Sequence, residues 1–162
     1  MRPTLIASAA LLLALALAGC GGKQAQQEQS SATAAPPVPA AGAAADYVVP
    51  ADLDQGPRAA ASAVDEEKAE LGEKLFNSKG CVACHAFGKR MSGPDLAGVT
   101  RSRTERWMES QILHPDKMTQ QDPISKELFA TYKVQMTNFG LTPDEAKAIV
   151  EFLKKKDKES GK

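Results

Sequence analysis

The 162-residue sequence lacks an excess of charge of either sign, a cysteine-rich framework and a long internal apolar run. Its 20 basic and 20 acidic residues balance, so the composition gives no reason to expect a nucleic-acid partner. Three cysteines are too few for a disulfide-rich scaffold. No internal stretch reaches the ~20 apolar residues that a membrane-spanning helix needs. One ordinary domain, or a small domain with a tail, fits this length.

Residues 1–19 have the composition of an export signal peptide. Arg2 gives a positive start, and residues 5–18 form an apolar run too short to span a membrane. The run ends in Leu17-Ala18-Gly19-Cys20, which resembles the lipobox of bacterial lipoproteins. The resemblance implies an exported protein whose Cys20 carries acyl chains, anchored to a membrane that faces the periplasm or the cell exterior. An ordinary cleaved signal, with Cys20 incidental, is the alternative.

Residues 20–64 are predicted to form a disordered tether to a folded domain at residues 65–162. The segment is rich in Ala, Gln, Pro, Ser and Gly and has no sustained helical or alternating period. Such a composition buries too little apolar surface to offset the entropy lost on ordering the chain. The short apolar cluster at residues 46–50 leaves open the alternative that this part packs onto the domain.

The segment Cys81-Val82-Ala83-Cys84-His85 is a C-x-x-C-H motif, which indicates covalent attachment of one haem. Two thiols on a tight helical turn can form thioethers with two vinyl groups of a porphyrin, and the adjacent His85 can bind the iron through Nε2. A zinc site needs about four ligands, but there is no second cysteine pair. A thioredoxin-like pair needs a βαβ context, which is not visible. A disulfide between Cys81 and Cys84 would leave His85 unused.

The second axial ligand of the iron has several candidates in the sequence. The five candidates are Met91, Met108, His114, Met118 and Met136. Met91 lies only six residues after His85, and Met136 lies just before the last predicted helix. A histidine–methionine pair raises the reduction potential of an electron carrier. Met91 is expected on the same side as His85, Met108 in a helix, and Met118 in a polar loop.

These motifs, in this order, resemble a class I (monohaem) cytochrome c. The resemblance implies an all-α fold of four to five short helices wrapped round one covalently attached haem c, with crossing N- and C-terminal helices. It makes Met136 the second axial ligand, although Thr137 stands where the family often has proline. In the run Ser92-Gly93-Pro94-Asp95-Leu96, it implies that the carbonyl of Pro94 accepts a hydrogen bond from Nδ1–H of His85.

Helical periodicity predicts the two outer helices. The first covers residues 66–78, and its buried face comprises Leu71, Gly72, Leu75 and Phe76. The resemblance implies that Gly72 and Phe76 cross the last helix close to Phe152. That last helix begins after the cap Thr142, with Glu145 completing a capping box. Its buried stripe is predicted to comprise Ala146, Ile149, Val150 and Leu153.

Two shorter helices are predicted between these. One covers residues 103–113 after a capping box formed by Ser102 and Glu105, and the other covers residues 123–133 after the cap Asp122. Apolar side chains of the second helix are candidates to line the haem pocket or to form general core: Ile124, Leu128, Phe129 and Tyr132.

The predicted ligands His85 and Met136 fill both axial positions, which leaves the iron no open site and favours one-electron transfer over enzymatic chemistry. The sequence therefore predicts a monomeric, membrane-tethered carrier between membrane respiratory complexes and exported reductases or oxidases. A five-coordinate haem enzyme or gas sensor is the alternative if Met136 does not coordinate, and a fixed electron-wiring subunit of a larger complex is another. Basic residues near the motifs could ring the haem edge for redox partners: Lys79, Lys89, Arg90 and Lys133.

Overall fold

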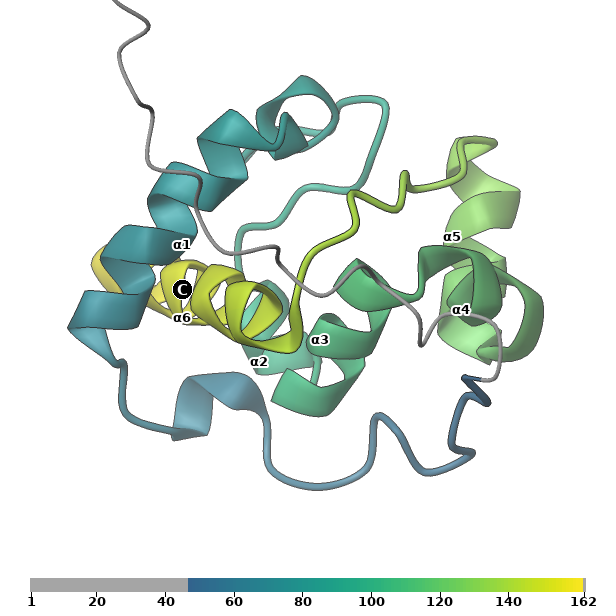
Figure 1. The fold of residues 1–162 in the computed structure, drawn as a ribbon, viewed down its shortest axis with the longest axis horizontal. Helices are drawn as coiled ribbons and strands as arrows, with labels where there is room; N and C mark the ends of the chain where they lie inside the picture. The colour runs from purple at the N-terminus through teal and green to yellow at the C-terminus, as the bar shows by residue number, and fades with distance from the viewer. Residues whose placement is uncertain (1–46, 162) are drawn as a thin grey trace, which may run out of the picture. The chain divides into compact units, whose positions relative to one another are not determined.

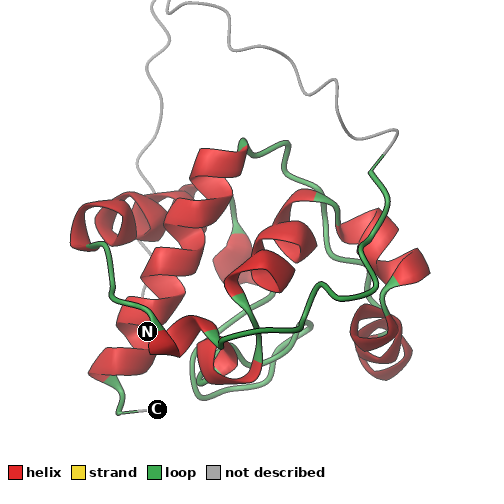
Figure 2. Ribbon diagram, turned by 90° about the horizontal axis from the view of Figure 1, so that it is seen from below, coloured by secondary structure: helices red, strands yellow, loops and turns green. Residues whose placement is uncertain are grey.

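A computed structural model describes residues 47–161, and every regular element in that range is helical (Figures 1 and 2). The α-helices are α1 (Glu66–Ser78), α2 (Val99–Ser102), α3 (Glu105–Leu113), α4 (Pro115–Gln121), α5 (Pro123–Tyr132) and α6 (Pro143–Glu159). Two short 3-10 helices are η1 (Ala59–Ala61) and η2 (Cys81–Ala83). None of these described helices is both long and apolar enough to cross a bilayer. The predicted signal peptide, Cys20 and tether residues 20–46 lie outside the described residues.

Helices α1 and α6 cross in direct contact, which confirms the predicted pairing of the outer helices (Figure 1). Gly72 makes the close approach possible, because a Cβ at this residue would lie 1.9 Å from the carbonyl oxygen of Ala148. The rings of Phe76 and Phe152 meet beside it with centroids 5.4 Å apart. Leu71 was wrongly predicted to be buried and is 48% exposed, because the buried face follows Ala69, Gly72 and Phe76 at helical spacing.

The N-terminus of α6 forms as predicted. Oγ1 of Thr142 accepts a hydrogen bond from the backbone N–H of Glu145, and the Glu145 carboxylate accepts one from the backbone N–H of Thr142. This reciprocal capping satisfies two N–H groups that a helix start leaves without partners. The predicted stripe along the helix is buried throughout: Ala146, Ile149, Val150 and Leu153.

A buried carboxylate on α6 holds the start of α2. Asp157 is 1% exposed, and its two oxygens accept hydrogen bonds from the backbone N–H of Gly98 at 2.6 Å, the backbone N–H of Thr100 at 3.0 Å and the hydroxyl of Thr100 at 2.6 Å. Three donors replace the water that burial removes from this carboxylate. The connection fixes the chain that leads from the histidine motif to α3.

The middle of the chain differs from the predicted pair of helices. The cap of α3 is Thr104, whose Oγ1 accepts from the backbone N–H of Trp107, and the predicted capping box at Ser102 is wrong because Ser102 ends α2. Asp122 caps α5 as predicted. Helix α4 was not predicted, and Met118 is fully buried in it rather than placed in a polar loop.

Residues 47–64, which we call the N-terminal strap, pack onto the helices, so the prediction of a disordered tether is wrong for this part. Leu53 is 3% exposed and belongs to the core. Its carbonyl oxygen accepts from the hydroxyl of Thr104 at 2.9 Å, and a carboxylate oxygen of Asp54 accepts from the backbone N–H of Thr104 at 2.9 Å. The hydroxyl of Tyr47 donates to Ser110 at 2.8 Å. The contacts of these few residues are enough to order the segment, although its overall content of apolar residues is low.

Candidate haem-binding site

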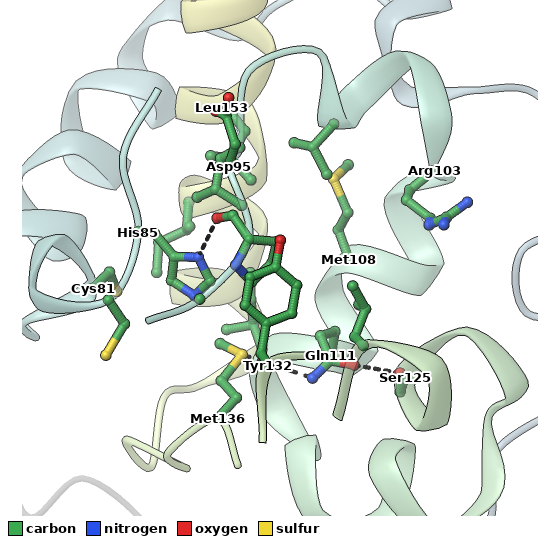
Figure 3. A pocket seen from close by; sticks show the side chains of 18 of the residues that line it. Cys81, His85, Asp95, Arg103, Met108, Gln111, Ser125, Tyr132, Met136 and Leu153 are labelled. Atoms are coloured by element: carbon green, nitrogen blue, oxygen red, sulfur yellow. Dashed lines mark hydrogen bonds between the residues drawn. The ribbon is translucent and has the colours of Figure 1, made fainter. Parts of the chain in front are cut away.

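The C-x-x-C-H motif and Met136 line one cavity of about 370 Å³ (Figure 3). This volume falls in the range of ~300–1,000 Å³ typical of pockets for small molecules and cofactors. Apolar side chains from every α-helix except α4 contribute to the lining, among them Phe76, Val99, Met108, Leu128 and Leu153. A cavity with a mainly apolar surface suits a flat, mainly apolar macrocycle.

The two cysteines of the motif lie on a single tight turn. The backbone N–H groups of Cys84 and His85 both donate to the carbonyl oxygen of Cys81, at 3.1 and 3.0 Å. Neither Cys81 nor Cys84 is in a disulfide, and both line the cavity. Burial raises the pKa of the Cys81 thiol above its usual value, which disfavours the thiolate. Two thiols and an imidazole therefore converge on the cavity from one turn of the chain.

The imidazole of His85 is held in one orientation. Its Nδ1 lies 3.0 Å from the carbonyl oxygen of Pro94, so the hydrogen bond that the resemblance implies is present (Figure 3). A donating Nδ1–H leaves Nε2 as the nitrogen with a free lone pair for a metal. Gly93 lets the ring fit, because a Cβ there would lie 2.7 Å from Cε1 of His85 and 2.9 Å from the carbonyl oxygen of Cys84. The sequence pattern alone does not indicate this packing role of Gly93.

Met136 lies in the loop between α5 and α6 and lines the same cavity as His85 (Figure 3). The side-chain amides of two neighbouring residues tie the loop to the α3–α4 corner: Gln135 donates to the carbonyl oxygen of Pro115 at 3.1 Å, and Asn138 donates to that of Leu113 at 3.2 Å. These bonds fix a loop in which Thr137 stands where the family often has proline. The thioether sulfur of Met136 is thus presented by an anchored segment.

Three of the other candidate ligands do not line this cavity. Met118 is fully buried in α4, and Met91 is 37% exposed. His114 stacks on Tyr47 with ring centroids 3.9 Å apart, and burial lowers its pKa. Met108 does line the cavity, from α3, and is 3% exposed. The geometry therefore reduces the sulfur candidates at the cavity to Met108 and Met136.

The four apolar candidates on α5 divide between the two roles that the sequence left open, cavity lining and general core. Leu128, Phe129 and Tyr132 line the cavity, whereas Ile124 packs against the core instead. The prediction missed Gln111, a polar residue of α3 that also lines the cavity. A helical wheel carries the only sequence signal for it, since Gln111 follows Trp107 and Met108 on the buried face.

A fixed imidazole, two free thiols on one turn and a thioether from a distant segment are the donor set of a c-type haem site. The family model described as cytochrome c matches residues 69–157 of this chain. The chain belongs to the cytochrome c family. Its cofactor is covalently bound haem c, and the residues around the cavity fit that group. Members of the family are typically electron-transfer proteins.

Known relatives support the same cytochrome c fold. The chain is 45% identical over 31 residues to cytochrome c-551 of Azotobacter vinelandii, a match that spans 19% of this chain and only 38% of that relative. The solved cytochrome c from Rhodothermus marinus is 35% identical, with a TM-score of 0.58 over 60% of this chain and 83% of that one. An engineered form of it, Rma TDE, is 34% identical, with a TM-score of 0.57 over 60% and 84% of the two chains.

Proposed function

We propose that this cytochrome c carries single electrons: Cys81 and Cys84 would attach haem c through thioethers, and Nε2 of His85 and the sulfur of Met136 would hold its iron. Bound haem c supplies an iron that changes its charge by one electron. The observation that supports the proposal is the convergence of His85 and Met136 on one cavity from segments separated by four helices. If both side chains bind the iron, oxygen or peroxide would find no free position on it.

The chain itself keeps both ligands in place when the charge of the site changes. Pro94 fixes the tautomer of His85 through the 3.0 Å contact, and Gln135 and Asn138 anchor the loop that carries Met136. A rigid site needs little rearrangement when an electron arrives or leaves. The mainly apolar surface of the cavity offers water few partners, and a methionine ligand raises the reduction potential, which suits a carrier.

Replacing Met136 with alanine tests the ligand assignment. The ferric protein is expected to lose the weak far-red charge-transfer band that marks methionine ligation, and the ferrous protein is expected to bind carbon monoxide rapidly. Met91→Ala is the matched control, because Met91 is exposed and lies outside the cavity. Rapid, stoichiometric binding of carbon monoxide by the unaltered ferrous protein at neutral pH would overturn the proposal and make the chain a haem enzyme or a gas sensor.

We further propose that the carrier is exported, monomeric and tethered to a membrane through lipidated Cys20, where it exchanges electrons with respiratory complexes and exported oxidases or reductases. Tethering raises the effective concentration of the carrier at partners on the same membrane. Arg90 supports docking at the mouth of the cavity, because its guanidinium lies 4.3 Å from the ring centroid of Tyr132, which lines the cavity. Exposed Lys89 directly precedes Arg90 in the sequence, and exposed Lys133 directly follows Tyr132.

Fractionation of cells tests the anchor. The unaltered protein is expected in the membrane fraction and Cys20→Ser in the soluble exported fraction, because the variant has no thiol to acylate. Equal distribution of the two would contradict lipidation. Purification in mild detergent tests the free carrier, which is expected to emerge alone. Constant co-purification with other subunits in fixed ratio would instead indicate a fixed electron-wiring subunit.

A further inference from the structure

The loop that carries Met136 is attached to the corner of the chain between α3 and α4. The carbonyl oxygens of Leu113 and Pro115, the residues on either side of His114, accept hydrogen bonds from two side-chain amides of the loop, at 3.2 and 3.1 Å. Both acceptors are backbone atoms, so no change of rotamer at the corner can preserve these bonds if the corner moves. The position of the loop therefore depends on the position of the corner.

Helix α4, which begins at this corner, lies away from the crossing of α1 and α6 (Figure 1). It packs mainly on α5 and α3, and it has no extensive contact with α1 or α6 in the part of the chain that the structure describes. Because α4 has only 7 residues, its own backbone hydrogen bonds are not enough to keep it folded. Contacts from outside the helix therefore decide how firmly the corner is held.

The N-terminal strap supplies such contacts at both ends of α4. At the start, the ring of Tyr47 stacks on the ring of His114 with centroids 3.9 Å and planes 16° apart, and its hydroxyl donates to Ser110, one turn earlier on α3, at 2.8 Å. At the end, the backbone N–H of Val49 donates to Oε1 of Gln121, the last residue of α4, at 3.0 Å. The strap thus holds the short helix from a segment more than 60 residues away in the sequence.

The strap and the Met136 loop are attached to the same corner. Nδ1 of His114 is buried and has no hydrogen-bond partner within the described residues, so the stack with Tyr47, rather than a hydrogen bond from this atom, fixes the ring. Ser110, which bonds to the strap, directly precedes Gln111, whose Nε2 lies 3.7 Å from the sulfur of Met136 (Figure 3). Release of the strap would therefore reach the loop through the corner and through the last turns of α3.

We propose that the N-terminal strap positions the axial methionine: Tyr47 and Val49 hold α4 and its corner in the place that keeps the sulfur of Met136 on the iron. The proposal rests on the proposed function, in which Met136 is an axial ligand. A ring stack and two hydrogen bonds oppose movement of the corner, and the sulfur can leave the iron only when the loop moves. Neither strap residue lines the cavity, so the strap acts on the ligand through the corner alone.

Binding of carbon monoxide to the ferrous, haem-loaded protein measures how fast the sulfur leaves, because at saturating carbon monoxide this step limits the rate. Tyr47→Ala removes the stack and the hydroxyl, and it is expected to raise the limiting rate by about threefold or more. Val48→Ala, on the same strap, is the control and is expected to leave the rate unchanged, because Val48 is 74% exposed. Hydrogen exchange in residues 133–140 is expected to quicken in Tyr47→Ala and not in the control.

A milder variant tests the other end of α4 and serves if Tyr47→Ala does not fold. Gln121→Ala removes the acceptor for the backbone N–H of Val49, and Gln120→Ala changes the exposed residue directly before it. Gln121→Ala is expected to raise the limiting rate, by less than Tyr47→Ala does, because one hydrogen bond is lost instead of a stack and a bond. Gln120→Ala is expected to match the unaltered protein.

A second arm separates positioning from a general loss of stability. Replacing both Gln135 and Asn138 with alanine removes the bonds between the loop and the corner, and in that background Tyr47→Ala is expected to have no further effect on the limiting rate. Equal limiting rates for Tyr47→Ala and Val48→Ala, or the same increase in both backgrounds, would overturn the role of the strap and leave the proposed function standing. Absence of the far-red band from the unaltered ferric protein would overturn both.

Discussion

Alanine at Gly72 is the most direct perturbation of the helix crossing that supports the site. Its Cβ would lie 1.9 Å from the carbonyl oxygen of Ala148 and 2.5 Å from the carbonyl carbon. Ordinary contacts of a Cβ lie at 3.4–4 Å, so α1 and α6 would have to separate by about 1.5 Å. Since the obstructing atoms belong to the backbone, no change of rotamer relieves the clash.

The size of the effect follows from two opposing contributions. Extra volume in a packed core costs ~1–3 kcal/mol, whereas alanine gains ~1 kcal/mol over glycine in helix propensity. Separating the helices also loosens the contact of Phe76 with Phe152, so the cost falls at the upper end of that range. We expect a net loss of about 2 kcal/mol. For a domain of this size, that lowers the midpoint of thermal unfolding by roughly 8–16 °C.

Thermal unfolding of the haem-loaded protein, followed by far-UV circular dichroism and by haem absorbance, measures this loss. Leu71→Ala is the control on the same helix, because its side chain is 48% exposed, and it is expected to change the stability by less than ~0.5 kcal/mol. Ala148→Gly is expected not to rescue Gly72→Ala, since it leaves the carbonyl group in place. A Gly72→Ala protein that unfolds at or above the temperature of the unaltered protein would refute the close crossing.

Two further predictions concern buried polar groups. Asp157→Ala removes the acceptor for three donors of Gly98 and Thr100. It is expected to lower the free energy of unfolding by about 3 kcal/mol or more, because each buried donor left unsatisfied costs ~1–3 kcal/mol. An unchanged midpoint of denaturant unfolding would contradict this account. Burial lowers the pKa of His114, and its ring stacks on Tyr47 of the N-terminal strap. Packing of the strap is therefore expected to be full above the ordinary histidine pKa of ~6.5 and to weaken as pH falls below it. Hydrogen exchange in the strap at pH 5 and pH 8 measures this, and His114→Phe, which keeps a ring for stacking, is expected to abolish the difference.

The parts of the fold that sequence alone could predict are those set by neighbouring residues. The capping box of Thr142 and Glu145 is complete within four residues, and the periodicity of α6 needs no other segment. The same holds for the turn that brings Cys81 and Cys84 together. Each of these interactions joins residues only a few positions apart, so a short stretch of sequence contains all of their partners.

The predictions from sequence were wrong where the local structure depends on contacts with a segment distant in the chain. Ser102 and Thr104 both have the side chain of a helix cap, but the backbone N–H of Thr104 donates to the carboxylate of Asp54, which lies in the N-terminal strap. The helical state of Met118 likewise depends on its burial, which its polar neighbours in the sequence do not indicate. Neither choice can be made from a local window.

In the candidate site, too, the sequence identifies the residue types, and the packing of distant segments decides which of them meet. The sequence could supply every ligand candidate, but excluding Met91, Met118 and His114 from the cavity required the arrangement of the helices. The contact between Gln111 and Met136 joins residues that no periodic pattern relates. Its existence depends on the packing of α3 against the loop before α6.

The N-terminal strap has a practical consequence for how the protein is produced in isolation. The family match begins at residue 69, so a truncated gene designed on homology would discard the strap. Such a fragment would lose the acceptors that Leu53 and Asp54 provide for Thr104, and it would expose the apolar surface that Leu53 covers. The unit that folds on its own therefore starts ahead of the homologous one, and expression from residue 47 should yield a more stable and less aggregation-prone product than expression from residue 65.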